Sequence, residues 1–559
     1  MHSTENAFDR PSPGYSRGML LLALAVFLLY AGLRLVSWHN TVLLADTDSM
    51  TYLTGLDAFY TWDWNEISQL NADHTPFYPA LGSLAKLLTG DSQAAAELVS
   101  FIFSLILVVA IGLLAREWGG NVSALLAMLV LAINGMMIEL SVAVLTEISY
   151  IAVIYVGFYI LWRQLKRLDF RLRIAIILGF VFGLAFLNRI EGLLYVIAVP
   201  ATVFLLGFIL RARDDRPAGT RFVAWNVVYI LVFLVLITPQ ILHVSNKMGA
   251  LAINGRVAWM VMWNAMPDRS SNATTFGLDF ADDEVNVHYI RSNYREVREK
   301  VGSGARGVSA LKERLKGALR NFDRIYRSLI GDQVTPLGFT MAVVGLVAMF
   351  QFGNYLAVGY AIFLAIVLLA GPLVQPALYA RHFSALIPLL CVLQGVGIKY
   401  TAEAIAQRGH RYLSSFAVLV IALTTVLVAA QMFPLKEALT PMQQNKEYDP
   451  EFLAEPIKII NARADISRIA AQRRYIAYFS GIDFVDAPYT DYDKMVCYLL
   501  AKNVDTLYVD FQRLAEYPYI KDLRTDKYRQ DFERIWIGSD NGQPRAALFK
   551  VNSNRRCGK

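Results

Sequence analysis

Long apolar runs, separated by short polar segments, occupy most of the chain between residues 18 and 433. A run of about 17 to 25 apolar residues is long enough to cross a bilayer as a helix. We expect about eleven such helices, centred on 18–36, 94–115, 122–138, 146–162, 174–188, 191–210, 222–244, 334–351, 355–371, 383–398 and 413–433. The pattern therefore predicts a polytopic α-helical membrane protein.

The composition agrees with a membrane protein that keeps a sizeable polar part. Of the 559 residues, 55% are hydrophobic and only 18% are charged, whereas soluble proteins average about 25% charged residues. No small-residue cleavage site follows the first apolar run, so we expect this run to be retained as a helix rather than removed as a signal peptide. The net charge is only +7, and most of the clustered bases lie in short loops. This distribution indicates bases that set the orientation of the chain in the membrane rather than bases that bind a nucleic acid.

Three basic loops predict the orientation of the chain. Loop 163–173 carries five Lys or Arg residues, loop 211–221 carries four and loop 399–411 carries three. With eleven helices and a cytoplasmic N-terminus, all three loops lie on the cytoplasmic side, as the positive-inside rule requires. The long loops 37–93 and 245–333 then lie on the outer face of the membrane.

The two largest polar regions have different patterns. In the second outer loop, residues 310–330 place apolar side chains at helical spacing with bases between them, which predicts an amphipathic helix on the membrane surface. In the tail, 450–474 looks helical and 505–510 looks like a strand. We expect the chain to divide into a transmembrane domain, 1–433, and a small α/β extracytoplasmic domain, 434–559.

The three cysteines add little to this picture. Cys391 lies in an apolar run and is expected in the core. Cys497 and Cys557 could pair if the tail is exported, but two cysteines do not make a disulfide framework.

Two carboxylates, Asp46 and Asp48, lie directly beyond the first apolar run, in the stretch LLADTDSMTYL. Charge close to a bilayer is costly and calls for an explanation. Tyr52 follows Asp48 by four residues, so both side chains share one face if the stretch is helical. A carboxylate here could act as general base for a hydroxyl or amine acceptor. The alternative is that the residues TDS at 47–49 only cap a helix.

Other polar residues also fall at predicted outer helix ends. His74, in DHTPFYP, could bind a substrate or a metal, although a single loop histidine often does neither. Glu147, in VLTEISY, could bind a polar substrate. The alternative is that its negative charge only stabilises the N-terminus of the helix that it begins, where the helix dipole is positive.

Two further motifs combine arginine with a second polar group. NRIEG places Arg189 and Glu191 between two apolar runs, where they could form a structural ion pair or hold a phosphate. YARHF places Arg381 and His382 at the start of the tenth predicted span. This pair suits a lipid phosphate, and the alternative is a snorkelling arginine.

The sequence contains no Walker loop, Rossmann glycine pattern, zinc-spaced Cys/His set or GxSxG elbow. A reaction driven by a nucleotide is therefore unsupported. An enzyme on the outer face must take its energy from a molecule already in the membrane, and a sugar on a polyprenyl phosphate meets this requirement.

The order of these motifs resembles the polyprenyl-phosphate-sugar-dependent glycosyltransferases of the GT-C fold, which include protein O-mannosyltransferases and lipid A aminoarabinose transferases. DSMTY is similar to the family's acidic residue with a tyrosine four positions later, and HTPFYP to its proline motif before the second span. The segment 94–147 resembles the long pattern that ends in a second acidic residue. NRIEG, RHFSALIPLL, YIAYFSGIDFVDAP and VDTLYVD look like later family segments. Many members carry adjacent acidic residues, whereas Thr47 separates the two here.

The resemblance implies inverting transfer of a hexosyl or pentosyl group from a polyprenyl phosphate on the outer face of the membrane. Asp48 would be the base, because its spacing to Tyr52 matches, and Glu147 would bind the sugar or orient the acceptor. Arg189 and Arg381 would steady the leaving phosphate. The remaining candidates for substrate binding are Asp46, Tyr52, His74, Glu191 and His382.

No cofactor is required by this scheme, although some relatives hold a divalent metal near the site, for which His74 with a carboxylate is the candidate here. The acceptor could be a glycolipid, a polysaccharide or a protein, and the compact outer domain resembles those of bacterial inner-membrane members. A flippase or transporter for lipid-linked sugars and a non-catalytic membrane scaffold are the alternatives. A transporter commonly shows repeats and mid-membrane charges, and neither is evident in the sequence.

Overall fold

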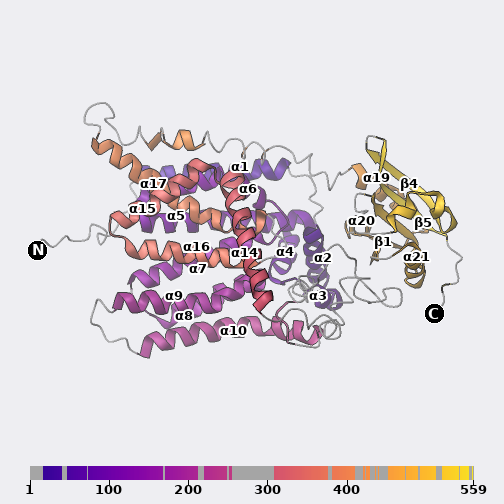
Figure 1. Ribbon diagram of the computed structural model, residues 1–559, viewed down its shortest axis with the longest axis horizontal. Helices are drawn as coiled ribbons and strands as arrows, with labels where there is room; N and C mark the ends of the chain where they lie inside the picture. Colours follow the sequence, from indigo (N-terminus) through magenta and orange to yellow (C-terminus); the bar gives the residue numbers. More distant parts are fainter. Residues whose placement is uncertain are drawn as a thin grey trace, which may run out of the picture.

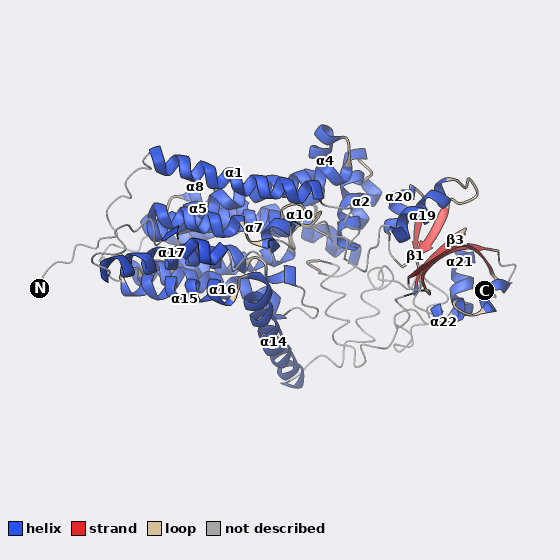
Figure 2. Ribbon diagram, turned by 90° about the horizontal axis from the view of Figure 1, so that it is seen from above, coloured by secondary structure: helices blue, strands red, loops and turns tan. Residues whose placement is uncertain are grey.

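The structure is a computed structural model in which long helices and a C-terminal sheet form two separate parts (Figure 1). The residues it describes are 17–40, 47–71, 74–167, 170–211, 220–248, 251–254, 308–374, 380–408, 420–421, 423–428, 435, 439, 451–472, 474–488, 491–511, 519–540, 542–552 and 557. The long helices run roughly parallel along the length of the molecule in both ribbon views (Figures 1 and 2).

The helical part matches most of the apolar runs. Its long helices are α1 (Arg17–Asn40), α5 (Ser92–Ala132), α7 (Glu147–Arg167), α8 (Leu172–Asn188), α9 (Tyr195–Arg211), α10 (Thr220–Met248), α15 (Pro336–Gln351), α16 (Tyr355–Val374) and α17 (Leu386–Arg408). Among the described residues, six helices are long and apolar enough to cross a membrane, or seven if one bent pair counts as a span. The protein is therefore an integral membrane protein, while the number of eleven spans stays a prediction. Most of the run at 413–433 lies outside the described residues.

The runs at 94–115 and 122–138 share one long element, α5, whose chain bends at Gly120. This glycine has φ 83° and ψ −172°, outside the helical region. A positive φ of this size is accessible to glycine at little cost, because it has no Cβ. The break at Gly120 therefore divides α5 into two helical halves, which correspond to the two expected helices.

The side chain of Arg34, in α1, binds the C-terminal end of α5. Its side chain is fully buried, and its guanidinium donates to the backbone carbonyls of Ala132 at 2.9 Å and Leu131 at 3.1 Å. The last carbonyls of a helix lack partners in the helix itself and carry partial negative charge. Arg34 therefore satisfies the end of α5 and fixes the turn into α6 (Gly135–Leu140), which leads to α7.

Short helices gather at the end of the bundle next to the C-terminal sheet, hereafter the sheet-facing end (Figure 1). They include α2 (Thr47–Thr61), α3 (Trp64–Leu70) and α4 (Phe77–Thr89), all from the first long loop. The expected amphipathic helix is present as α14 (Val308–Ser328), followed by η3 (Leu329–Gln333). Two single turns, η1 (Ile190–Leu194) and η4 (Ala380–Phe383), precede α9 and α17 respectively.

The C-terminal part is a mixed five-stranded sheet with helices. Its strands are β1 (Arg468–Ala471), β2 (Asp483–Asp486), β3 (Thr506–Asp510), β4 (Phe532–Asp540) and β5 (Gln543–Val551), in the order β2-β1-β3-β5-β4. β1 pairs in parallel with β2 and β3, and β5 pairs antiparallel with β3 and β4. The helices of this part are α19 (Glu451–Asn461), α20 (Tyr475–Ser480), α21 (Tyr492–Ala501) and α22 (Ile520–Leu523), with one turn, η6 (Asp526–Gln530).

The expected strand at 505–510 is present as β3, but the helix expected over 450–474 is wrong in its second half. Helix α19 ends at Asn461, and Arg468–Ala471 form β1, which lies between β2 and β3 in the sheet. Most of β1 is buried between two parallel neighbours. A short apolar run of this kind cannot be distinguished from a buried helical segment by its periodicity.

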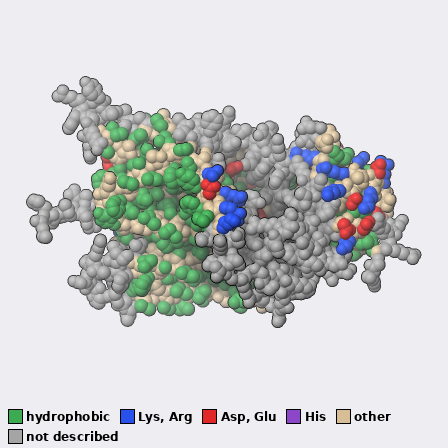
Figure 3. Space-filling view, in the orientation of Figure 1, with side chains coloured by type: hydrophobic (Ala, Val, Ile, Leu, Met, Phe, Trp, Pro, Cys, Tyr) green, Lys and Arg blue, Asp and Glu red, His purple; other side chains and the backbone are tan. Residues whose placement is uncertain are grey.

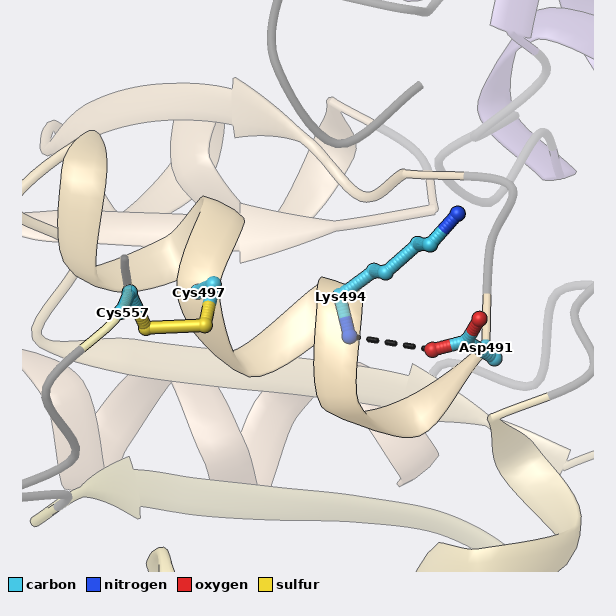
Figure 4. Close-up of a disulfide and its surroundings, with 4 residues drawn as sticks. All are labelled: Asp491, Lys494, Cys497 and Cys557. Carbon is cyan, nitrogen blue, oxygen red and sulfur yellow. Dashed lines mark hydrogen bonds between the residues drawn. A yellow bond between two sulfur atoms is a disulfide. The ribbon is translucent and has the colours of Figure 1, made fainter. Parts of the chain in front are cut away.

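A disulfide joins Cys497 of α21 to Cys557, close to the end of the chain (Figure 4). At the start of α21, the Asp491 side chain accepts a hydrogen bond from the backbone N–H of Lys494 at 3.0 Å, which caps the helix. Cys391 is buried in the helical part, as expected.

Candidate functional site

Four segments that are far apart in the sequence meet at one charged cluster. Asp48 lies in the first turn of α2, Glu147 is the first residue of α7, and Arg189 joins α8 to η1. Arg381 lies in η4, immediately before α17. Each of these side chains therefore comes from a helix end or a helix junction.

Arg381 connects two of the carboxylates. Its Nη2 atom donates to Oδ2 of Asp48 at 2.7 Å, and its Nε atom lies 3.7 Å from Oε1 of Glu147. The side chains of Arg381 and Asp48 are 20% and 17% exposed, whereas that of Glu147 is only 5% exposed. Arg381 and Asp48 are therefore partly open to solvent, whereas Glu147 is almost closed off.

Arg189 holds the inner side of the same cluster. Its Nη1 atom lies 2.7 Å from Oε1 of Glu147, and its Nη2 atom lies 3.2 Å from Oε1 of Glu191. Nη1 also donates to Oγ1 of Thr146 at 3.3 Å. A planar guanidinium can serve several acceptors at once, which a lysine ammonium cannot do in the same geometry.

The glycine of NRIEG permits this arrangement. A Cβ atom at Gly192 would lie 2.3 Å from the backbone nitrogen of Phe186 in α8. Only a residue without a side chain allows η1 to pack this closely on α8. The close approach keeps Arg189 and Glu191 at the cluster.

The cluster carries more negative than positive groups. Three carboxylates, those of Asp48, Glu147 and Glu191, face the two guanidinium groups. Oε2 of Glu147 is buried and has no hydrogen-bond partner among the described residues. Such an oxygen is costly to leave unpaired, so this atom is available to a donor group of a ligand.

Tyr52 completes one wall of the cluster. Its hydroxyl lies 3.4 Å from Oγ1 of Thr146, and its ring makes an edge contact with His74, with the centroids 5.4 Å apart. Burial, followed by the negative charges of Asp48 and Glu147, raises the pKa of Tyr52 to about 12. The phenol is therefore neutral at physiological pH and can act as a hydrogen-bond donor but not as a base.

A pocket that is partly open to solvent lies beside these charges. One side is polar and contains Glu147, Arg189, Glu191, Arg381 and His382. The other side is largely apolar and includes Val367, Leu368, Gly371 and Pro372 of α16, with Leu194 of η1. The pocket can therefore receive a molecule with a charged head next to an apolar chain.

Most of the residues predicted from the sequence occupy this region. The cluster is formed by Asp48, Tyr52, Glu147, Arg189, Glu191 and Arg381. His382 lines the pocket. His74 contacts the ring of Tyr52, and Asp46 lies outside the described residues. Within the part of the chain that the structure describes, no group of three or more His, Cys, Asp or Glu residues is placed to hold a metal ion.

The sequence interpretation missed Thr146 and the neighbouring tyrosine pair. Thr146 contacts both Tyr52 and Arg189, and its position directly before Glu147 was the available signal. The hydroxyls of Tyr150 and Tyr195 lie 3.2 Å apart, and Tyr150 lines the pocket. No pattern in the sequence brings these two tyrosines together.

Comparisons with known proteins agree with this architecture. Residues 73–243 match the family described as dolichyl-phosphate-mannose-protein mannosyltransferase. A comparison with curated proteins finds no match.

Two solved structures cover nearly all of the chain. The Archaeoglobus fulgidus oligosaccharyltransferase tethered with an acceptor peptide has a TM-score of 0.57 and 12% identity, over 96% of this chain and 74% of that chain. ArnT from Cupriavidus metallidurans bound to undecaprenyl phosphate has a TM-score of 0.54 and 13% identity, over 97% of this chain and 100% of that chain. The protein therefore has the fold of the GT-C glycosyltransferases, and the resemblance predicted from its motifs is confirmed.

Proposed function

We propose that the protein is an inverting glycosyltransferase that moves a sugar from a polyprenyl phosphate to an acceptor at the outer face of a membrane. The observation that carries this proposal is the contact of Arg381 with Asp48, because Arg381 also lines a pocket that has one charged and one apolar side. This combination suits a phosphate attached to a lipid, next to a carboxylate that can accept a proton.

The donor would bind with its phosphate near Arg381 and His382 and its first isoprenoid units against α16. Guanidinium groups bind phosphate through paired, charge-assisted hydrogen bonds. A similar fold binds undecaprenyl phosphate in the ArnT structure, and another binds a dolichol-phosphate in the oligosaccharyltransferase AglB from Archaeoglobus fulgidus. These two complexes support a polyprenyl phosphate as the donor class.

The ion pair of Arg381 with Asp48 explains how the base would be controlled. A carboxylate held by an arginine is a weaker base than a free one. A donor phosphate would compete for Arg381 and so release Asp48 when the donor is bound. Asp48 would then accept the proton of the acceptor hydroxyl or amine as that atom bonds to the anomeric carbon.

The leaving group needs no strong acid. The bond between the anomeric carbon and the phosphate oxygen breaks with its electron pair on oxygen, which yields a free polyprenyl phosphate. Arg189 and Arg381 would stabilise the charge that develops on this phosphate. The buried Oε2 atom of Glu147 would accept a hydrogen bond from a sugar or acceptor hydroxyl.

Helix directions support the proposed orientation. Helix α7 begins at Glu147 in the cluster and ends with Lys166 and Arg167 at its other end, and α17 likewise runs away from the cluster to Arg408. The basic end of α7 and the far end of α17 therefore lie away from the cluster, so a cytoplasmic location for these helix ends places the cluster outside. The disulfide supports an extracytoplasmic domain over 434–559, because disulfides persist in oxidising compartments. A bacterial inner membrane with a periplasmic C-terminal domain fits this arrangement.

The test is a transfer assay with purified protein and a panel of polyprenyl-phosphate sugars and acceptors. We expect transfer by the parent protein and a loss of about 100-fold or more in Asp48→Asn, the usual size of a general-base contribution. Asp526→Asn is a matched control, because Asp526 lies on the surface of the C-terminal part. Equal transfer by the parent and Asp48→Asn would exclude Asp48 as the base.

The alternative classes give different results in the same system. A flippase would move the lipid between leaflets without forming a glycosidic bond, and a scaffold would do neither. Either result with a folded protein that binds the donor would contradict the proposed transfer.

A further inference from the structure

Helix α14 differs in direction from the spanning helices. It runs across the bundle in Figure 1 and projects from its side in Figure 2. Residues 316–331, which include its second half, form an angle of 104° with α15. A helix that is nearly perpendicular to the spanning helices lies close to the plane of the membrane.

One face of α14 is fixed to the helical part. Asn321 and Ile325 are buried there. The Asn321 amide donates to the backbone carbonyl of Leu373 at 3.0 Å and to that of Pro372 at 3.5 Å, at the end of α16. Because Pro372 also lines the pocket, the position of α14 is coupled to one wall of the pocket.

The remaining surface of α14 divides into an apolar stripe and a basic stripe. Leu319, Phe322 and Tyr326 are 65%, 52% and 52% exposed, and their spacing of three and four residues puts them on one side of the helix. The exposed bases follow a second stripe: Lys316, Arg320, Arg324 and Arg327. Figure 3 shows Lys and Arg side chains gathered at the edge of the apolar surface, where α14 crosses it.

We propose that α14 is a binding surface for anionic phospholipid headgroups of the leaflet next to the pocket. The apolar stripe would enter the boundary between headgroups and acyl chains, and the basic stripe would lie against the phosphates. Asp323 pairs with Arg327 at 3.0 Å, so Lys316, Arg320 and Arg324 provide most of the attraction. This lipid binding does not depend on the proposed transfer activity.

Charge complementarity favours a bilayer over a soluble partner. A soluble polyanion would use the basic stripe but would leave three large apolar side chains exposed to water. A neutral membrane would leave the basic stripe without partners, so the apolar stripe would enter it less deeply and less often. Only an anionic membrane surface uses both stripes together.

The test places an environment-sensitive fluorophore on Phe322→Cys in nanodiscs. The native cysteines would not react, because Cys391 is buried and Cys497 is bonded to Cys557. We expect a blue-shifted emission and stronger quenching by spin-labelled lipid in phosphatidylglycerol discs than in phosphatidylcholine discs. High salt should reduce this difference, since exposed charges are screened.

A charge variant makes the test specific. Arg320→Gln with Arg324→Gln should weaken the preference for phosphatidylglycerol about 30-fold, since each base contributes about 1 kcal/mol near an anionic surface. Lys521→Gln with Arg529→Gln removes the same charge from the C-terminal part and should change nothing. Equal emission in both disc types, or an unchanged preference in the double variant, would overturn the proposal. A response only to a soluble polyanion such as heparin would also overturn it.

Discussion

At the scale of single residues, the cluster depends on the shape of its arginines as much as on their charge. Arg189 contacts Glu147, Glu191 and Thr146 through one planar group. Removing one partner from a buried charge network leaves the other charges uncompensated. A conservative exchange is therefore a sharper test of the geometry than removal of the charge.

Arg189→Lys should lower transfer about tenfold or more without unfolding the protein, because lysine keeps the charge but cannot bridge the same acceptors. The measurement is kcat and KM for the donor, together with a thermal unfolding curve. Arg463→Lys is the control, since Arg463 pairs with Asp465 in the C-terminal part. Full activity in Arg189→Lys would show that the bridging geometry is not required.

Some residues of the cluster could be predicted from the sequence, because they lie in recognisable motifs. Asp48, Arg189 and Arg381 stand out, because charges at the ends of apolar runs are expensive. Arg34 does not stand out, because its partners are backbone carbonyls almost a hundred residues away. A contact of this kind has no signature in local sequence.

At the scale of elements, α2 connects the cluster to the C-terminal part. Asp57 accepts hydrogen bonds from Lys86 at 2.6 Å and from the hydroxyl of Tyr478, in α20, at 2.7 Å. Glu66 of α3 pairs with Arg474, beside α20, at 3.2 Å. The helix that carries Asp48 is therefore attached to the C-terminal part by a hydrogen bond, and the next helix, α3, by an ion pair.

Tyr478→Phe should loosen this attachment, because it removes a hydrogen bond to a carboxylate that is worth about 1 to 3 kcal/mol. Faster amide hydrogen exchange is expected in α2 and α20, with slower transfer if the attachment holds Asp48 in place. Tyr60→Phe is a matched control on α2, because Lys86 contacts the ring of Tyr60 rather than requiring its hydroxyl. Unchanged exchange in Tyr478→Phe would mean that the contact does not hold α2.

Helices and strands could be predicted where a hydrophobic pattern extends over many residues. The prediction was wrong where the pattern covers only a few residues. The amphipathic α14 and strand β3 lie where the sequence placed them. The residues of β1 were assigned to a helix, because a short apolar run fits either structure until its neighbours are known. Pairing with β2 and β3 decides in favour of the strand.

At the scale of the whole molecule, the disulfide ties the end of the chain to α21. It closes a segment with a sequence separation of 60 residues, which includes β3, β4 and β5. A crosslink of this kind restricts the unfolded chain and typically stabilises a fold by about 2 to 4 kcal/mol.

Replacing Cys497 and Cys557 by serine should therefore expose the C-terminal sheet to proteolysis at lower denaturant concentrations. The helical part should keep its thermal transition, because both cysteines lie outside it. The parent protein treated with a reductant serves as the comparison and should behave like the double variant. Unchanged protease sensitivity, with both thiols shown to be free in the reduced parent, would contradict a stabilising role.

The sequence by itself determined that the protein resides in a membrane, which residues were chemically out of place, and which fold family its motifs resemble. These properties follow from local composition and order, because apolar length and isolated charge are visible without neighbours. Only the tertiary structure decided that Asp48, Glu147, Arg189 and Arg381 share one ion network, that Thr146 contacts Arg189 in it, and that Arg34 binds the end of α5. The physical reason is that these contacts join helix ends up to 333 residues apart, and their distances depend on how the helices pack.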